Sequence, residues 1–333
     1  MAVLRWATLP ALLLTVASPS AAVQTAPAAA TNPLLPGGPD PWIVREGDTF
    51  YYMATLGDRL AIRATRDLSR LAEAPETVVW RPQATGPNAQ SIWAPELHRI
   101  DGKWYIYYTA AAAGHDDDAH RGVFVLENPR ADPLKGTWID RGRVATARPG
   151  IDGTTFEHGG RRYFVYSPYV GDESDLAIVA MRNPWTVTGP ETILARPDRA
   201  WERQGGRKIL EGPAFLKGPK GELFLSYSGS ACWSDGYAVG LLRASPDADP
   251  LKAASWKKAR EPILKTTPSA GVFAPGHNGF FTGPSGATWM VYHANTSAEM
   301  GCTGKRAPHA QRVAFDASGA PTLPKLDREA VVR

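Results

Sequence analysis

Five residues that can do acid–base chemistry recur at regular intervals along this 333-residue chain. They are Asp40, Glu96, Asp152, Glu211 and His277. Each opens one copy of a repeated sequence pattern, and successive copies begin 56, 56, 59 and 66 residues apart. Carboxyl groups that lie close together raise one another's pKa, which is how a carboxyl group becomes a general acid near neutral pH. If the fold brings these residues together, they form the paired-carboxylate cleft that glycoside hydrolysis requires.

The pattern that follows each of these residues indicates short strands joined by tight turns. In the second copy, the apolar segment Glu96–Ile100 leads into the turn Asp101-Gly102 and the aromatic segment Trp104–Tyr108. An Asp-Gly pair between two such segments is typical of a hairpin. A third apolar segment, Gly122–Leu126, follows, and Trp138 closes the stretch expected for a fourth strand. Repeats of this length with about four strands each are typical of propellers, so the five copies predict an all-β, five-bladed β-propeller over residues 32–333.

In such a fold the first strand of every repeat lines the central channel, so the five ionisable residues converge at one mouth of it. A single acid in this place would be read as a turn cap or as the partner of an arginine. Five ionisable groups at one repeat position favour a functional cleft, because burying them together is costly. Trp93, just upstream of Glu96, is the best candidate for an aromatic platform against a sugar ring. We expect a structural role for Glu96 itself.

The net charge and the first thirty residues bear on partners and location. Lys and Arg number 37 against 33 Asp and Glu, with no basic run, which argues against nucleic-acid binding. Residues 1–22 have the form of a secretory signal: Arg5, the apolar run Leu9–Ala17, and small residues that allow cleavage after Ala22. That run is too short to span a bilayer, so no membrane span is predicted. We expect a flexible leader at 23–31 and a secreted or periplasmic protein.

Cys232 and Cys302 are the only cysteines. In an oxidising compartment, two cysteines far apart in sequence are a candidate disulfide. The alternative is a pair of free buried thiols. Metal binding is the least favoured interpretation, since neither cysteine has a CxxC partner or a nearby histidine at ligand spacing.

Five segments carry a resemblance to a known family. They are GGPDPWIV (37–44), SIWAPELHRIDGKWYIYYTA (91–110), IDGTTFEHGGRRYFVYS (151–167), EGPAFL (211–216) and PGHNGFF (275–281). From about residue 32 to about residue 324, the sequence resembles glycoside hydrolase family 43, whose members are five-bladed propellers that cut arabinose- and xylose-containing polysaccharides.

The resemblance implies roles for individual residues. Asp40 matches the general base, Glu211 the general acid, and Asp152 the residue that orients the site and tunes the acid. Because the family inverts anomeric configuration, we expect Asp40 and Glu211 to lie more than ~6 Å apart, with room for a water molecule. Arg306 matches an arginine that contacts sugar hydroxyls. His277 matches a channel histidine beside a bound calcium or other cation, which we expect to be held mostly through water; no cofactor is expected to be required.

Within the family, SIWAPELH, PGHNGFF and the two cysteines look most like exo-acting α-L-arabinofuranosidases on α-1,5-arabinan. The expected substrates are therefore plant cell-wall arabinan or arabinoxylan oligosaccharides. The alternatives are a β-xylosidase or endo-arabinanase on the same scaffold, or a non-catalytic sugar-binding propeller. Such a propeller need not keep Asp40, Asp152 and Glu211 together. The run HDDDAH (115–120) could hold a metal ion, but a solvated loop is favoured, and nothing in the sequence specifies an oligomeric state.

Overall fold

The computed structural model describes residues 1–4, 30–323 and 329–330. Most of the predicted signal and leader, residues 5–29, lies outside the described residues. Within the described ranges, no helix is long and apolar enough to cross a membrane.

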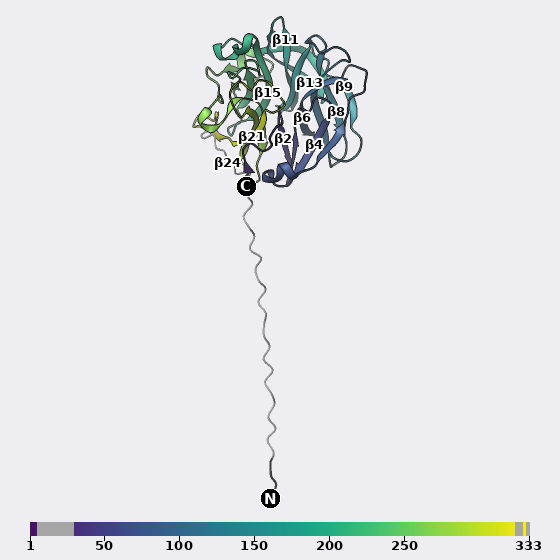
Figure 1. The fold of residues 1–333 in the computed structure, drawn as a ribbon, viewed down its shortest axis with the longest axis vertical. Coiled ribbons are helices and arrows are strands. Elements are labelled where there is room, and N and C mark those ends of the chain that lie inside the picture. The colour runs from purple at the N-terminus through teal and green to yellow at the C-terminus, as the bar shows by residue number, and fades with distance from the viewer. Residues whose placement is uncertain (5–29, 324–328, 331–333) are drawn as a thin grey trace.

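The regular secondary structure of the described residues is mainly antiparallel β-strand with a few short 3₁₀ helices, which confirms the all-β prediction (Figure 1). The first sheet contains β2 (Trp42–Glu46), β3 (Thr49–Met53), β4 (Leu60–Thr65) and β5 (Glu76–Trp80). The second contains β6 (Gln90–Ile100), β7 (Lys103–Ala111), β8 (Arg121–Asn128) and β9 (Ile139–Arg143). The third contains β10 (Gly150–His158), β11 (Arg161–Val170), β13 (Leu176–Asn183) and β14 (Thr186–Ala195).

The fourth sheet contains β15 (Lys208–Lys217), β16 (Leu223–Gly229), β17 (Ala238–Ala244) and β18 (Lys257–Lys258). The short β12 (Glu173–Ser174) pairs with β11 and with β15 and so joins the third sheet to the fourth. The fifth contains β19 (Phe273–Thr282), β20 (Thr288–Asn295) and β21 (Ala307–Arg312). Two small pairs remain, β1 (Ala30–Thr31) with β24 (Glu329–Ala330) and β22 (Ala314–Phe315) with β23 (Pro321–Thr322).

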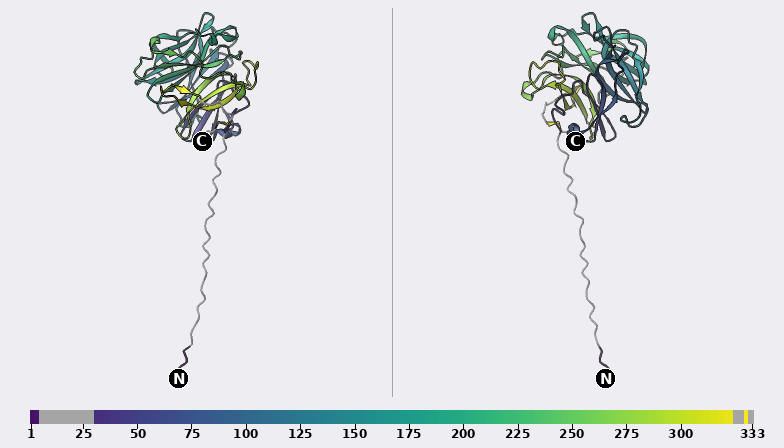
Figure 2. Two further views of the ribbon diagram at one scale, coloured as in Figure 1. Left: turned by 90° about the vertical axis from the view of Figure 1, so that its left-hand side faces the viewer. Right: turned by 45° about the vertical axis from the view of Figure 1, so that its right-hand side comes forward.

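The five sheets form a closed ring. The first strand of each sheet contacts the first strand of the next in chain order, and β19 contacts β2 (Figures 1 and 2). The segment before β2 lies along β21: the backbone N–H of Leu34 donates to the carbonyl of Pro308, and that of Gly38 donates to the carbonyl of Arg306. This closing contact brings Arg306 beside the residues that precede β2.

Apolar clusters lie between neighbouring sheets. Ile62 of the first sheet packs with Trp104 and Phe124 of the second, and Met290 of the fifth packs with Val239 of the fourth. The tyrosines of β7 are buried. Each fully buried apolar side chain contributes about 1.5–3 kcal/mol, so the aromatic strands supply much of the stability of the ring.

Near the start of each first strand, one residue of left-handed backbone conformation occupies the same structural position; β6 and β19 contain a second such residue three positions earlier, Ser91 and Ala274. The φ angles are 54° at Asp40, 43° at Ala94, 57° at Asp152, 55° at Gly212 and 46° at His277. In β6, β10, β15 and β19 these residues lie within shifts of the strand register. Such bulges re-aim the side chains beside them.

The backbone N–H groups of all five residues bond to side chains of the preceding sheet; that of Gly212 donates to a carboxylate oxygen of Asp152 (3.0 Å). Ala94 donates to Thr55 Oγ1 (2.7 Å), Asp152 to Thr109 Oγ1 (2.9 Å), His277 to Ser228 Oγ (2.7 Å) and Asp40 to His293 Nδ1 (3.1 Å). Every such bond ties the start of one sheet to its neighbour, so the mouth of the channel is held by contacts around the ring.

The structure corrects the repeat position that the sequence analysis assigned to Glu96 and Glu211. The structural counterpart of Asp40 and Asp152 in the second sheet is Ala94, two residues before Glu96, and in the fourth sheet it is Gly212, one residue after Glu211. Residue type misled the alignment, because alanine and glycine occupy this position in the second and fourth sheets, with a glutamate nearby in each. Glu96 lies deeper, buried, with His98 Nε2 at 2.8 Å from its carboxylate, in keeping with the structural role expected for it.

Candidate active site

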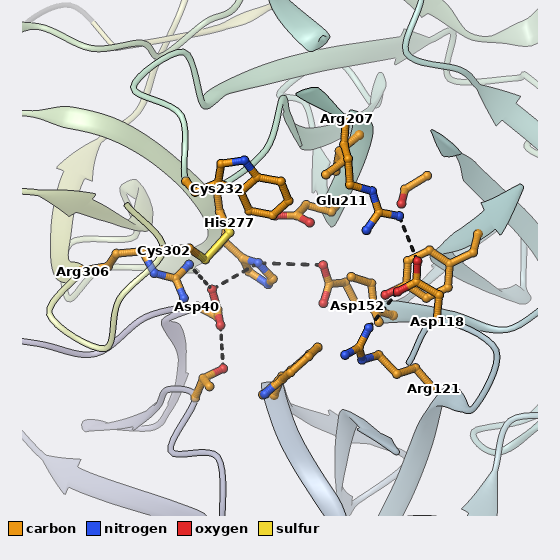
Figure 3. A pocket seen from close by; sticks show the side chains of 17 residues that line it. Asp40, Asp118, Arg121, Asp152, Arg207, Glu211, Cys232, His277, Cys302 and Arg306 are labelled. Atoms are coloured by element: carbon orange, nitrogen blue, oxygen red, sulfur yellow. Dashed lines mark hydrogen bonds and ion pairs between the residues drawn. A yellow bond between two sulfur atoms is a disulfide. The ribbon is translucent and has the colours of Figure 1, made fainter. Parts of the chain in front are cut away.

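A cavity of about 400 Å³ opens over the starts of the first strands (Figure 3). All the residues predicted for the site line it: Asp40, Trp93, Asp152, Glu211, His277 and Arg306. Glu96 is not among its lining residues. The structure therefore brings together side chains that are spread over the whole length of the described chain.

Asp40 is held as a charged carboxylate. Thr55 Oγ1 donates a 2.6 Å hydrogen bond to one carboxylate oxygen, and Arg306 Nη1 lies 3.2 Å from the other. Burial alone would raise the pKa of Asp40, but the positive charge of Arg306, together with His277 and His293, holds this pKa well below its ordinary value. A buried carboxylate that stays ionised is a proton acceptor.

Glu211 is in the opposite state. Burial raises the pKa of its carboxyl group to about 7, and the charge of Asp40 acts in the same direction. The hydroxyl of Tyr237 donates a 2.7 Å hydrogen bond to Oε1 and opposes part of this rise. Glu211 therefore carries a proton over much of the range below neutral pH and can donate it.

Asp152 and His277 lie between these two groups. The Nδ1 atom of His277 is 3.4 Å from the Asp40 carboxylate and 3.9 Å from that of Asp152 (Figure 3). Burial lowers the pKa of His277 and raises that of Asp152, on which the charges of Glu211 and Asp40 act in the same direction. Asp152 thus competes with Glu211 for a proton, because two carboxylates in one buried site are not both easily ionised.

Gly212 makes this packing possible. Its φ of +55° favours glycine, and a Cβ atom there would lie 3.1 Å from the imidazole ring of His277. Its backbone N–H also donates a 3.0 Å hydrogen bond to Asp152. The residue after the acid therefore positions both the histidine and the second carboxyl group.

Comparison with known proteins identifies the family of the chain. The family described as glycosyl hydrolases family 43 matches residues 30–321. The chain belongs to that family. An extracellular exo-α-(1→5)-L-arabinofuranosidase of Streptomyces avermitilis is 39% identical over 96% of this chain and 69% of its own length. An enzyme of the same name from Streptomyces chartreusis is 40% identical over 82% of this chain and 85% of its own.

The fold of the chain is also similar to that of a solved structure. The α-L-arabinofuranosidase of Lactobacillus brevis superposes with a TM-score of 0.82 at 30% identity, covering 89% of this chain and 96% of the other. The resemblance inferred from the five sequence segments is thereby confirmed.

The wall of the cavity that faces Asp40 and Arg306 is held together by ion pairs. Asp118 accepts from both Arg121 (2.8 Å) and Arg207 (2.9 Å), which come from segments 86 residues apart (Figure 3). The guanidinium of Arg121 also lies over the ring of Trp93, 4.6 Å from its centroid. One face of Trp93 is therefore occupied by a cation, and the role of this residue as a sugar platform stays a prediction.

The predicted disulfide is confirmed. Cys232 and Cys302 are bonded, and both line the cavity (Figure 3). The bond joins the loop after β16 to the loop before β21, and the second of these loops carries Arg306. Part of the wall around Asp40 is thus covalently fixed.

The cation expected beside His277 stays a prediction. Calcium takes six to eight oxygen ligands, whereas the Nδ1 side of this imidazole faces Asp40 and Asp152. Within the described residues, the one group of three or more His, Cys, Asp and Glu ligand atoms at metal-binding distance is His115, Asp117 and His120. Those three residues are exposed in the loop between β7 and β8, as expected for a solvated loop. The protein atoms near His277 therefore do not form a calcium cage, and an ion there would depend on water.

Several residues that shape the site were not singled out from the sequence. They are Thr55, Asp118, Arg121, Tyr169, Arg207, Trp233, Tyr237 and His293. Thr55 and His293 lie in or beside second strands, where their repeat position matches Thr109 and Ser228. That recurrence of hydrogen-bonding side chains was a usable signal. Tyr237 and Trp233 lie in a loop with no recurring pattern.

Proposed function

We propose that the protein is an exported, inverting exo-α-L-arabinofuranosidase that releases L-arabinose from α-1,5-linked arabinan or its oligosaccharides. The observation that carries this proposal is that Asp40, in contact with Arg306, and Glu211, buried and in contact with Tyr237, line one cavity of a family 43 chain. The similarity to the two Streptomyces enzymes, both named extracellular, supports the linkage and the export. In this proposal the ring of five sheets is a five-bladed β-propeller over residues 32–333, preceded by a signal peptide (1–22) and a leader (23–31).

The proposed reaction is a single displacement. Glu211 gives its proton to the glycosidic oxygen as the bond from that oxygen to the anomeric carbon breaks. A water molecule attacks the anomeric carbon from the opposite face, and Asp40 takes the proton that this water loses. Thr55 and Arg306 fix the Asp40 carboxylate, and Asp152 tunes the proton affinity of Glu211. The product is arabinose of inverted anomeric configuration.

Product analysis tests this function against its alternatives. Incubation with α-1,5-arabino-oligosaccharides, an aryl arabinofuranoside and an aryl xyloside should release arabinose alone, with inverted configuration in the first minutes. Mixed oligosaccharides would indicate an endo-arabinanase, and xylose release would indicate a β-xylosidase. Sugar binding without turnover on any of these substrates would indicate a non-catalytic propeller.

The pH dependence of activity follows from the two pKa shifts. Because Glu211 must be protonated, we expect kcat/KM for arabinotriose to fall as the pH rises through about 7. Because Asp40 must be ionised and its pKa is well below 3.8, the acidic limb should lie at the low end of the accessible range. Initial rates at constant ionic strength, with a stability control at each pH, measure both limbs. An alkaline limb near the ordinary pKa of glutamate would contradict the assignment.

Tyr237 should set the position of the alkaline limb. Its hydroxyl stabilises the ionised form of Glu211, so in Tyr237→Phe the pKa of Glu211 rises and the alkaline limb of kcat/KM moves to higher pH. The control is Tyr163→Phe, since Tyr163 packs between the third and fourth sheets and does not line the cavity. A shift in the opposite direction, or an equal shift in both variants, would refute this role.

A further inference from the structure

Trp233 is exposed where an aromatic side chain would normally be covered. Its exposed fraction is 49%, and among the described residues it is the only exposed Trp, Tyr or Phe. It lines the cavity that holds the carboxyl groups. An indole ring left open to water at the edge of a site offers a large apolar face to a ligand.

The ring is held in place before any ligand binds. Its Nε1–H donates a 2.8 Å hydrogen bond to the carbonyl of Gly205. Gly205 has a φ of +83°, and a Cβ there would lie 3.2 Å from the same Nε1 atom. The backbone next to Trp233 is also fixed, because the preceding residue, Cys232, is bonded to Cys302. A side chain fixed at both its backbone and its tip loses little freedom when a ligand stacks on it.

Trp233 belongs to the side of the cavity that carries Glu211. The loop after β16 that contains Trp233 also contains Tyr237, which bonds to Glu211. Gly205, which receives the indole hydrogen bond, precedes β15, the strand of Glu211. A general acid lies next to the oxygen that departs, so the sugar leaving with that oxygen is on the same side.

We infer that Trp233 is the platform for the sugar on the leaving side of the scissile bond, and that the Cys232–Cys302 disulfide is the positioning element that holds it. This inference rests on the proposed function. The C5 methylene of a 1,5-linked arabinofuranose gives that sugar an apolar surface that can pack on the indole face. Trp93 is less suited to this task because Arg121 covers one of its faces.

The test distinguishes binding of the leaving-side sugar from binding of the arabinose unit that is cleaved off. In Trp233→Ala, kcat/KM for α-1,5-arabinotriose should fall about tenfold, mainly through KM. The inhibition constant of free L-arabinose, which reports the position of the released sugar, should stay within about twofold of wild type. Trp233→Phe should recover most of the loss. Ile139→Ala, which removes an exposed apolar side chain on β9 outside the cavity, is the matched control and should change neither value.

The disulfide is tested in the same assay. Cys302→Ser should raise KM for arabinotriose in the wild-type background and have a smaller effect in the Trp233→Ala background, because the platform is then already gone. Equal effects in both backgrounds would overturn the part assigned to the disulfide. Wild-type KM in Trp233→Ala, or a parallel rise in the inhibition constant of arabinose, would overturn the platform. Failure of the wild-type protein to release arabinose would instead refute the proposed function.

Discussion

Replacing Glu211 with alanine is expected to reduce hydrolysis of α-1,5-arabinan and its oligosaccharides by about 10²–10⁴-fold. An arabinose alkoxide is a poor leaving group and needs the proton that Glu211 supplies. An aryl arabinofuranoside with a strongly acidic phenol leaves without that proton, so its hydrolysis should be largely spared. Initial rates of wild type and variant on arabinotriose and on a dinitrophenyl arabinofuranoside give the loss of activity on each substrate, and the ratio of the two losses tests the role of Glu211.

The alkaline limb provides a second readout in the same variant. If Glu211 is the group that titrates at about 7, the limb should disappear from the residual aryl activity of Glu211→Ala. Glu157→Ala is a suitable control, because Glu157 is an exposed glutamate on β10. Full activity on arabinan in Glu211→Ala would remove Glu211 from the mechanism. An equal loss on both substrates would mean that it does not act as the acid.

The division of labour between the carboxyl groups depends on where the positive charge lies. Arg306 contacts Asp40 directly, and its positive charge stabilises the ionised form of the Asp40 carboxylate. Among the described residues, no arginine forms an ion pair with Asp152 or Glu211, and burial together with the charge of Asp40 raises the pKa of both. Arg306 reaches Asp40 because the segment before β2 runs along β21. The contact that closes the ring therefore also distinguishes the proposed base from the proposed acid.

Much of this arrangement could be predicted from the sequence because it repeats. The recurring strand pattern indicated five sheets, and the acids at its starts indicated a shared cleft. Two cysteines far apart in sequence indicated a candidate disulfide, which the structure contains. Asp40, Asp152 and Glu211 do line one cavity with His277, as predicted.

What could not be predicted depends on single departures from the repeat. The sequence aligned Glu96 with Asp40 by residue type, although the structural equivalent is Ala94, because an alanine at that position has no ionisable group to mark it. Tyr237 sets the proton affinity of Glu211 from a loop with no recurring pattern, and only tertiary contact reveals it. The exposure of Trp233 was equally hidden, since most tryptophans of the chain pack between sheets or against their edges. Apolar residue type alone does not tell a core position from the edge of a cavity.

The second large effect is expected for Asp40. In Asp40→Asn, kcat/KM should fall by about 10²–10⁴-fold on arabinotriose and on the dinitrophenyl arabinofuranoside alike, because water must be activated whatever group leaves. This common loss separates the base from the acid, whose removal spares the activated substrate. Asparagine keeps the shape and can still accept from Thr55, so the loss reports proton transfer. Asp48→Asn, at an exposed aspartate in the turn after β2, is the control.

Removing the charge of Asp40 should also change its neighbour. That charge raises the pKa of Glu211, so the alkaline limb of the residual activity should move to lower pH in Asp40→Asn. Azide then tests the role directly, because it attacks without needing a base. With the dinitrophenyl substrate, azide should restore turnover in Asp40→Ala and give an arabinofuranosyl azide of inverted configuration. Rescue with retained configuration would refute the single displacement, and unaltered activity without azide would refute Asp40 as the base.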